Sequence, residues 1–360
     1  MRIGFGGESS IRKMMTTSLS QTPLSVLDLA HVRQGGTVAE ALHNTLDMAQ
    51  AAERLGYRRF WLAEHHNISG VASAATSVLI GHVAGGTRTI RVGAGGIMLA
   101  NHAPLVIAEQ FGTLEALYPG RIDLGLGRAP GGDAAAALAL RRDMARQGED
   151  FPKLVEELRG FLGPKREGAL VTAYPGVGSN VPVWLLGSSL FSAALAAELG
   201  LPFAFAAHFQ PDYLMPALDV YRRSFQPSEV LEQPYVMVGL PVIAAETDEE
   251  ARWLATSAQQ LFLNLVRNRP GPVASPTDED ALDWNALERA AVEAKMRAAV
   301  IGGRERVREG LELFLAQTRA DELMIVTTTY DHEARMRSYE MVAEMAGLEK
   351  ELGREVETRA

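Results

Sequence analysis

Short strand-like segments alternate with longer helical segments along almost the whole chain, and this alternation most constrains the fold. Runs rich in β-branched and aromatic residues predict strands, while apolar residues spaced three and four apart predict helices between them. The eight predicted strands are residues 24–30, 59–64, 90–99, 121–126, 183–186, 202–207, 235–244 and 322–328. Alternating units of this kind give parallel strands, and eight of them close into a barrel more readily than they extend. We therefore expect an α/β protein with a TIM (β/α)8 barrel, and a doubly wound open sheet is the alternative.

The helices expected between these strands complete eight strand–helix units. They are residues 37–55, 73–84, 105–117, 134–162, 189–199, 212–225, 248–266 and 304–318, followed by a terminal helix from His332. One barrel domain with insertions is expected over residues 23–346, after an N-terminal extension, 1–22, that we predict to be flexible, and before a C-terminal tail, 347–360. Glycine- and proline-rich stretches interrupt the alternation of strands and helices. We interpret one such region, residues 266–300, as a lid over the active face or as an insertion without a role.

Composition narrows the range of partners. Hydrophobic residues make up 47% of the chain, enough for a large core, yet no apolar run is long enough for a membrane span. The net charge of −9 leaves no basic face for nucleic acid, so small molecules are the expected partners. The absence of cysteine excludes disulfides and thiolate chemistry, so any redox reaction needs a cofactor. The first residues lack the apolar region of a secretory signal, and a cytoplasmic location is expected.

Polar and glycine-rich motifs follow the predicted strands at their carboxyl ends, where TIM barrels carry their chemistry. These motifs are Glu64-His65-His66-Asn67 after the second strand, Gly95-Gly96 in the third, Gly127-Arg128 after the fourth, Gly187-Ser188-Ser189 after the fifth and His208 after the sixth. An imidazole at such a position suits general acid–base catalysis, although a buried histidine bonded to a carboxylate can also be purely structural. Neighbouring residues on a strand point to opposite faces, so His65 and His66 should not chelate one ion together, and no metal is expected.

Arg128 and the serines after the fifth strand predict a phosphate site. A guanidinium grips phosphate through parallel hydrogen bonds, and the N–H groups and hydroxyls at the start of a helix attract anions. The alternative for Ser189 is an ordinary helix cap. Gly95 and Gly96 within an apolar strand indicate either a bulge or the close approach of a flat ring. Pro130 takes the third glycine position of a dinucleotide-binding motif, which argues against a Rossmann site.

Six motifs together resemble the luciferase-like monooxygenases, most closely the single-chain branch related to the luciferase alpha subunit. The resemblance covers residues 24–345. The motifs are Leu24-Ser-Val-Leu-Asp-Leu-Ala30, Ala52-Glu-Arg-Leu-Gly-Tyr57, Phe60-Trp-Leu-Ala-Glu-His-His66, Val92-Gly-Ala-Gly-Gly-Ile-Met-Leu99, Arg121-Ile-Asp-Leu-Gly-Leu-Gly-Arg128 and Gly187-Ser-Ser189. Each motif is weak by itself, but six in this order are specific for the family.

The resemblance implies a monooxygenase that uses dioxygen and reduced flavin mononucleotide (FMN), the flavin being supplied by a separate flavin reductase, to oxidise a small organic substrate. It implies that His65 is catalytic, that Glu64 orients it, and that the chain forms a homodimer. The residues that match cofactor-contacting positions are Gly95 and Gly96, at a non-prolyl cis peptide beneath the flavin ring, and Arg128, Ser189 and Ser192 around the phosphate, with Ser188 beside them. Luciferase has a reactive cysteine where this chain has Gly127 and a glutamate where it has Ser188, so light emission is not expected.

Three other functions remain open from the sequence. Some members of the family use a deazaflavin as a hydride carrier without oxygen, which would make the protein a dehydrogenase. Others bind flavin without known turnover. A metal-dependent barrel hydrolase is the third. The substrate itself is not indicated by any motif.

Overall fold

A computed structural model describes residues 18–129, 131–140 and 150–348. Most of the expected extension 1–22 and of the tail 347–360 lies outside the described residues. At the described start of the chain, the short 3-10 helix η2 (Leu19–Gln21) buries Leu19 in the core.

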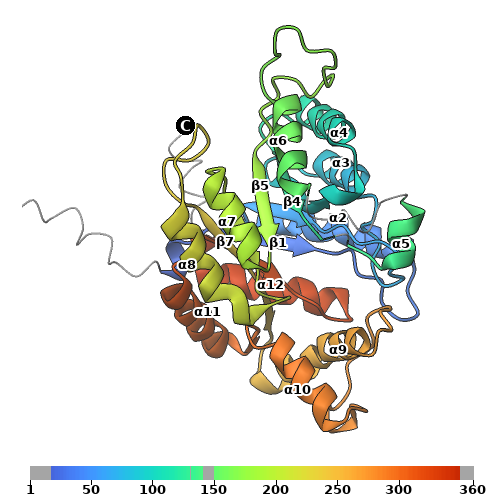
Figure 1. Ribbon diagram of the computed structural model, residues 1–360. Helices are drawn as coiled ribbons and strands as arrows, with labels where there is room; N and C mark the ends of the chain where they lie inside the picture. The colour runs from blue at the N-terminus through green and yellow to red at the C-terminus, as the bar shows by residue number, and fades with distance from the viewer. Residues whose placement is uncertain (1–17, 130, 141–149, 349–360) are drawn as a thin grey trace, which may run out of the picture.

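Eight parallel strands close into a barrel, and helices surround it (Figure 1). The strands are β1 (Leu24–Asp28), β2 (Arg59–Leu62), β3 (Arg91–Met98), β4 (Ile122–Gly127), β5 (Val183–Gly187), β6 (Phe203–Ala206), β7 (Val236–Ala244) and β9 (Glu322–Val326). Strands β1 to β7 pair in sequence order, and β9 pairs with both β7 and β1, which closes the ring. The expected TIM barrel is confirmed, and the open-sheet alternative is wrong.

The helices lie close to their predicted positions. They are α2 (Val38–Arg54), α3 (Thr76–Gly86), α4 (Pro104–Leu117), α5 (Ala134–Ala139), α6 (Phe151–Leu162), α7 (Leu190–Glu198), α8 (Leu214–Ser224), α9 (Asp248–Val266), α10 (Ala286–Lys295), α11 (Arg304–Thr318) and α12 (His332–Ala346), with 3-10 helices η3 (Leu99–Asn101), η5 (Pro211–Tyr213) and η6 (Glu279–Ala281). Side chains of Thr37, Thr247 and Asp331 cap the helices that follow them by accepting backbone hydrogen bonds. Within the described ranges, no helix combines the length and the apolar character needed to cross a membrane.

Two predicted regions differ from the structure. The single helix expected over residues 134–162 contains two described helices, α5 and α6, with residues 141–149 outside the described part. Residues 266–300 contain helix α10, which packs beside α9 (Figure 1), and lead into a ninth strand, β8 (Val300–Gly302). This short strand pairs with the last residues of β7 beyond the barrel.

Backbone hydrogen bonds hold part of the predicted lid against the barrel. The Val273 N–H donates to the Val32 carbonyl over 2.9 Å, and the Gln34 N–H donates to the Val273 carbonyl over 2.8 Å. Gly70 lies so close to this segment that a Cβ added to it would come within 2.1 Å of the Gly271 carbonyl oxygen. The start of the segment is therefore a fixed wall that is tied to the loops after β1 and β2.

Alternation along the strands divides the core into two layers. Residues such as Val26, Phe60 and Val92 face outward and pack against the helices in the larger cluster. Their neighbours point into the barrel and form a smaller cluster around Trp61 and Trp184, whose rings meet edge to face at 5.2 Å. Successive side chains along each strand therefore alternate between the outer core and the inside of the barrel, and both faces of the sheet are covered by apolar groups.

Buried charges close the N-terminal end of the barrel. The Arg59 guanidinium forms ion pairs with Asp123 at 2.8 Å and with Glu322 at 3.0 Å, and the side chains of both acids are fully buried. Glu322 also accepts hydrogen bonds from Ser25 and from the Tyr235 hydroxyl, while Asp123 pairs with Arg91 and accepts the indole N–H of Trp61. Each carboxylate therefore has several donors, which offsets the cost of removing it from water.

Candidate active site

One pocket at the mouth of the barrel contains every residue that the sequence assigned to cofactor binding. This barrel-mouth pocket has about 910 Å³ of empty space, its open mouth included. Its walls carry Gly95, Gly96, Arg128, Ser188, Ser189 and Ser192. Apolar side chains of the inner barrel, among them Leu27, Trp61, Met237 and Met324, complete it. The pocket is thus apolar on one side and polar where α7 begins.

The peptide bond between Gly95 and Gly96 is cis, as the resemblance implies. The pairing of β3 with β4 shifts register between Ala94 and Ile97, so the bulge expected as an alternative is also present. A Cβ on Gly96 would come within 2.7 Å of the Gly125 carbonyl oxygen, and one on Gly95 within 2.6 Å of Leu27. At Gly96 a side chain would collide with backbone, whereas at Gly95 the Leu27 side chain would have to move. The two glycines leave bare backbone on the pocket wall for a flat ring to approach.

Arg128 is placed to bind an anion. Its guanidinium stacks over the Phe191 ring, 4.4 Å from the ring centroid, and no carboxylate of the described residues pairs with it. Ser189 occupies the N-cap position of α7, as the alternative from the sequence expected, but its hydroxyl makes no capping hydrogen bond. Together with the buried Ser192, these groups form a cationic, donor-rich corner that suits a phosphate.

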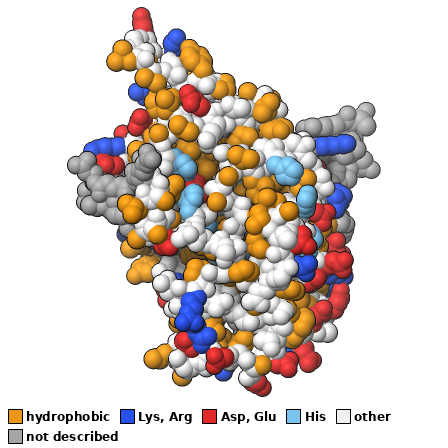
Figure 2. All heavy atoms as spheres, turned by 90° about the vertical axis from the view of Figure 1, so that its right-hand side faces the viewer, with side chains coloured by type: hydrophobic (Ala, Val, Ile, Leu, Met, Phe, Trp, Pro, Cys, Tyr) orange, Lys and Arg blue, Asp and Glu red, His pale blue; other side chains and the backbone are white. Residues whose placement is uncertain are grey.

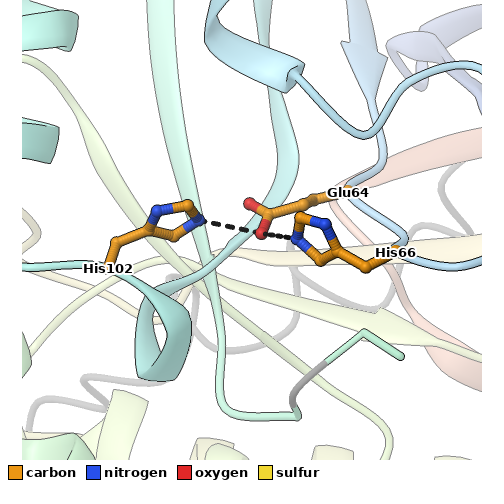
Figure 3. Close-up of side chains that lie close together, drawn as sticks. All are labelled: Glu64, His66 and His102. Atoms are coloured by element: carbon orange, nitrogen blue, oxygen red, sulfur yellow. Dashed lines mark hydrogen bonds and ion pairs between the residues drawn. The ribbon is translucent and has the colours of Figure 1, made fainter. Parts of the chain in front are cut away.

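Glu64 lies at the centre of a hydrogen-bonded cluster with two histidines (Figure 3). Its Oε1 accepts from His66 Nε2 at 2.7 Å and from His102 Nε2 at 2.8 Å, while its Oε2 accepts the Met98 N–H at 3.1 Å. Burial raises the pKa of Glu64, but these hydrogen bonds outweigh it and lower the pKa below its ordinary value of 4.5. The expectation that Glu64 orients His65 is wrong, because Glu64 instead holds His66 and ties the ends of β2 and β3 together.

Glu64, His66 and His102 each offer one possible metal-ligand atom. These three atoms lie within 4.8 Å of one another, a spacing that could hold a divalent metal ion. The sequence pointed away from metal because His65 and His66 diverge, whereas the structure brings His66 together with His102 instead. The hydrogen bonds described above satisfy the same atoms without an ion. The expected absence of a metal stays a prediction, which metal analysis of dialysed protein would test.

His65 faces a second cavity, the apolar chamber, which lies beside the barrel-mouth pocket and has about 960 Å³ of empty space. His65 Nδ1 is buried and has no hydrogen-bond partner among the described residues. Burial lowers the pKa of His65, and the nearby Glu64 opposes this only in part. The imidazole is therefore neutral at pH 7, and because its ring borders the chamber it is a candidate proton donor or acceptor for a molecule bound there.

His208 and Phe209 form the wall between the two cavities, since both residues line both of them. Their rings lie 4.4 Å apart, and His208 Nδ1 hydrogen-bonds the Gly239 carbonyl at 3.4 Å. The sequence marked His208 only as the polar end of the sixth strand, and nothing in it distinguished Phe209. Figure 2 shows histidine side chains, in pale blue, surrounded by hydrophobic side chains, in orange, on one face of the molecule.

We expect His208 to make folding sensitive to acid. Burial lowers its pKa to about 4, from an ordinary value of 6.5. Between these values the unfolded chain binds the proton and the folded chain does not, so stability is complete above pH 6.5 and falls as the pH approaches 4. The loss from His208 should be on the order of 3 kcal/mol. Urea unfolding at pH 7 and pH 4 should show a smaller drop for His208→Gln than for the unaltered chain. The exposed His82→Gln is the control, and equal drops for both variants would contradict the prediction.

Comparison with known proteins identifies the family. A sequence profile of the luciferase-like monooxygenases matches residues 22–322. An Escherichia coli (strain K12) protein named luciferase-like monooxygenase is 50% identical over 321 residues, covering 89% of this chain and 96% of that protein. The chain belongs to the luciferase-like monooxygenase family. A second relative, the Bacillus subtilis (strain 168) protein YvbT, is 56% identical over 333 residues, covering 92% and 99% of the two chains.

Solved structures share the barrel fold of this chain. The crystal structure of apo-MsnO8 superposes with a TM-score of 0.85 at 36% identity, covering 91% of this chain and 99% of that one. The oxygenating constituent of 3,6-diketocamphane monooxygenase from Pseudomonas putida, in complex with FMN, gives 0.69 at 16% identity, with 89% and 96% covered. An F420-dependent secondary alcohol dehydrogenase gives 0.65 at 13% identity, with 90% and 99% covered. At such identities the last two comparisons concern the fold alone.

Proposed function

We propose that this luciferase-like monooxygenase binds reduced FMN in the barrel-mouth pocket and uses dioxygen to oxidise a small organic molecule in the apolar chamber. The observation that carries the proposal is that all six residues predicted to contact the cofactor line one pocket, beside the chamber that His65 borders. When bound, reduced FMN would supply the electrons for the reduction of dioxygen.

The residues present fit FMN at both of its ends. The bare backbone at Gly95 and Gly96 leaves room for the flat ring, because neither residue places a side chain on the pocket wall. Arg128 and the hydroxyls of Ser189 and Ser192 would hold the phosphate at the start of α7. His65 would exchange a proton with the molecule bound in the chamber, and the apolar walls would keep water away from the reacting atoms.

Two alternatives keep the same pocket but change the chemistry. One structural neighbour is an F420-dependent alcohol dehydrogenase, and a deazaflavin-dependent enzyme would transfer hydride without oxygen. A non-catalytic flavin-binding protein would bind oxidised flavin tightly and show no substrate-dependent oxygen uptake. The close likeness to a relative named as a monooxygenase favours FMN and oxygen over both.

Anaerobic titration separates these functions. Reduced FMN should bind in stoichiometric amount and, once air is admitted, be reoxidised at a rate that substrate changes. Preferential binding of reduced deazaflavin, with no response to air, would instead favour the dehydrogenase. Oxidised FMN that binds as tightly as reduced FMN, without oxygen uptake, would favour the binding protein.

Replacing Arg128 with methionine tests the phosphate corner directly. The loss of two charge-assisted hydrogen bonds should weaken FMN binding by about 10- to 100-fold. Affinity for riboflavin, which lacks the phosphate, should change little, and calorimetry measures both. The exposed Arg223→Met serves as the matched control. An equal loss of affinity for riboflavin and FMN would show that Arg128 does not contact the phosphate.

The remaining expectations accompany this proposal. A transient flavin reductase would deliver reduced FMN, and a homodimer would be the functional form. Sedimentation that detects only monomer would contradict the homodimer. The cytoplasmic location expected from the sequence stays a prediction.

A further inference from the structure

The apolar chamber has walls from three parts of the chain. The barrel contributes Ile243, helix α9 contributes Phe262 and Leu265, and the 266–300 segment contributes Pro270 and Met296. The start of the segment, next to Pro270, is tied to the loop after β1 by backbone hydrogen bonds of Val273. These three parts of the chain together surround a concave site for a small molecule.

The chamber has no charged side chain in its wall, as far as the described residues go. Its polar groups are the imidazoles of His31, His65 and His208 and the Thr328 hydroxyl. Burial lowers the pKa values of His31 and His208 to about 4, and the pKa of His65 is lowered as well. All three imidazoles are therefore neutral at pH 7. The barrel-mouth pocket differs, because Arg128 gives it a cation.

This distribution of charge decides which molecules can enter. A carboxylate or sulfonate that moves from water into an uncharged wall loses its hydration, which costs several kcal/mol when no cation replaces it. Apolar surface gains about 25 cal/mol for each Å² that it buries. Four neutral polar groups are sufficient to orient one or two heteroatoms of a bound molecule.

We propose that the apolar chamber binds a neutral, mainly hydrocarbon substrate with its oxidisable atom beside His65, and that it discriminates against anionic analogues. The inference rests on the proposed function for its choice of reaction, but binding to the chamber can be measured without turnover. The 266–300 segment then acts in substrate selection, since Met296 and its neighbours form part of the wall.

A matched pair of probes tests the inference. Octyl methyl sulfide is neutral, and the sulfide of the same chain length that ends in a carboxylate is anionic, while the methyl ester of that acid is a neutral control of similar size. Calorimetry with the full chain, both loaded with oxidised FMN and free of flavin, measures their affinities. The neutral sulfide should bind at least about tenfold more tightly. Equal affinities, tighter binding of the carboxylate, or no binding of the neutral sulfide would each overturn the proposal.

Two variants locate the binding site. Met296→Arg places a cation in the chamber wall and should remove or reverse the preference, whereas Met296→Gln should keep it. Leu265→Arg is a second variant at a half-exposed position, 44% accessible, where a long charged side chain can be accommodated. A preference that neither arginine variant alters would mean that the probe binds elsewhere, and this would overturn the inference.

The two proposals can fail separately. If the neutral sulfide binds selectively and responds to Met296→Arg while reduced FMN does not bind, the chamber assignment stands and the proposed function fails. If FMN binds and is reoxidised but the two sulfides bind equally, the proposed function stands and the substrate class is wrong.

Discussion

Replacing His65 with asparagine is expected to slow oxidation by about 10²- to 10⁴-fold, the usual contribution of a general acid or base. Asparagine can form a hydrogen bond but cannot take up a proton at neutral pH, and the free Nδ1 of His65 is lost with it. FMN affinity should be unchanged, because His65 lines the chamber and not the barrel-mouth pocket. Stopped-flow reoxidation of bound reduced FMN and oxygen uptake with octyl methyl sulfide measure the effect.

The exposed His82→Asn is the matched control for this experiment. Since burial lowers the pKa of His65, the imidazole stays neutral below the ordinary value of 6.5. Activity that needs the neutral form should therefore persist as the pH falls through 6.5. Unchanged rates in His65→Asn would refute the catalytic assignment, and a loss of FMN affinity would show a structural role instead.

Arg59→Met should lower the free energy of unfolding by about 3–5 kcal/mol, the cost of removing one partner from a buried ion pair. Methionine fills a similar volume but leaves Glu322 with only the hydroxyl donors of Ser25 and Tyr235. Asp123 still pairs with Arg91 at 2.6 Å, so most of the cost should arise at Glu322. Urea denaturation at pH 7 measures the change.

Two further variants identify the source of this loss. Arg223→Met removes an exposed ion pair with Asp219 and should cost less than about 1 kcal/mol. Adding Glu322→Gln to Arg59→Met removes the unpaired charge and should restore part of the stability. A loss below about 1 kcal/mol for Arg59→Met, or no recovery in the double variant, would mean that the network contributes little.

The barrel could be predicted because each of its strands is a short, mainly apolar segment that is followed by a longer segment with helical spacing of its apolar residues. The elements that were missed lack this signal. Strand β8 (Val300–Gly302) has three residues and depends on the end of β7 for pairing. Helix α10 lies in a polar stretch, although Asn285 and Glu288 form a capping box that the sequence could have revealed.

The lining of the barrel-mouth pocket could be predicted where a residue directly follows its own strand, as Arg128 and Ser188 do. Contacts that depend on the direction of a side chain could not be predicted from the sequence. Asn67 adopts a positive φ of 57°, so the chain leaves β2 in a turn that the sequence did not indicate. His102, the second partner of Glu64, lies 38 residues further along the chain. The chamber likewise depends on residues from distant segments, which only the closed barrel brings together.

The charged network around Arg59 and the two cavities occupy opposite ends of the barrel, and this separation has a consequence for how such a protein can diversify. Changes in the loops beyond β7 can alter which molecules fit without touching the bonds that keep the barrel folded. New substrate specificities can therefore arise by substitution of chamber residues such as Leu265 and Met296, while the ion pairs of Arg59 are left unchanged.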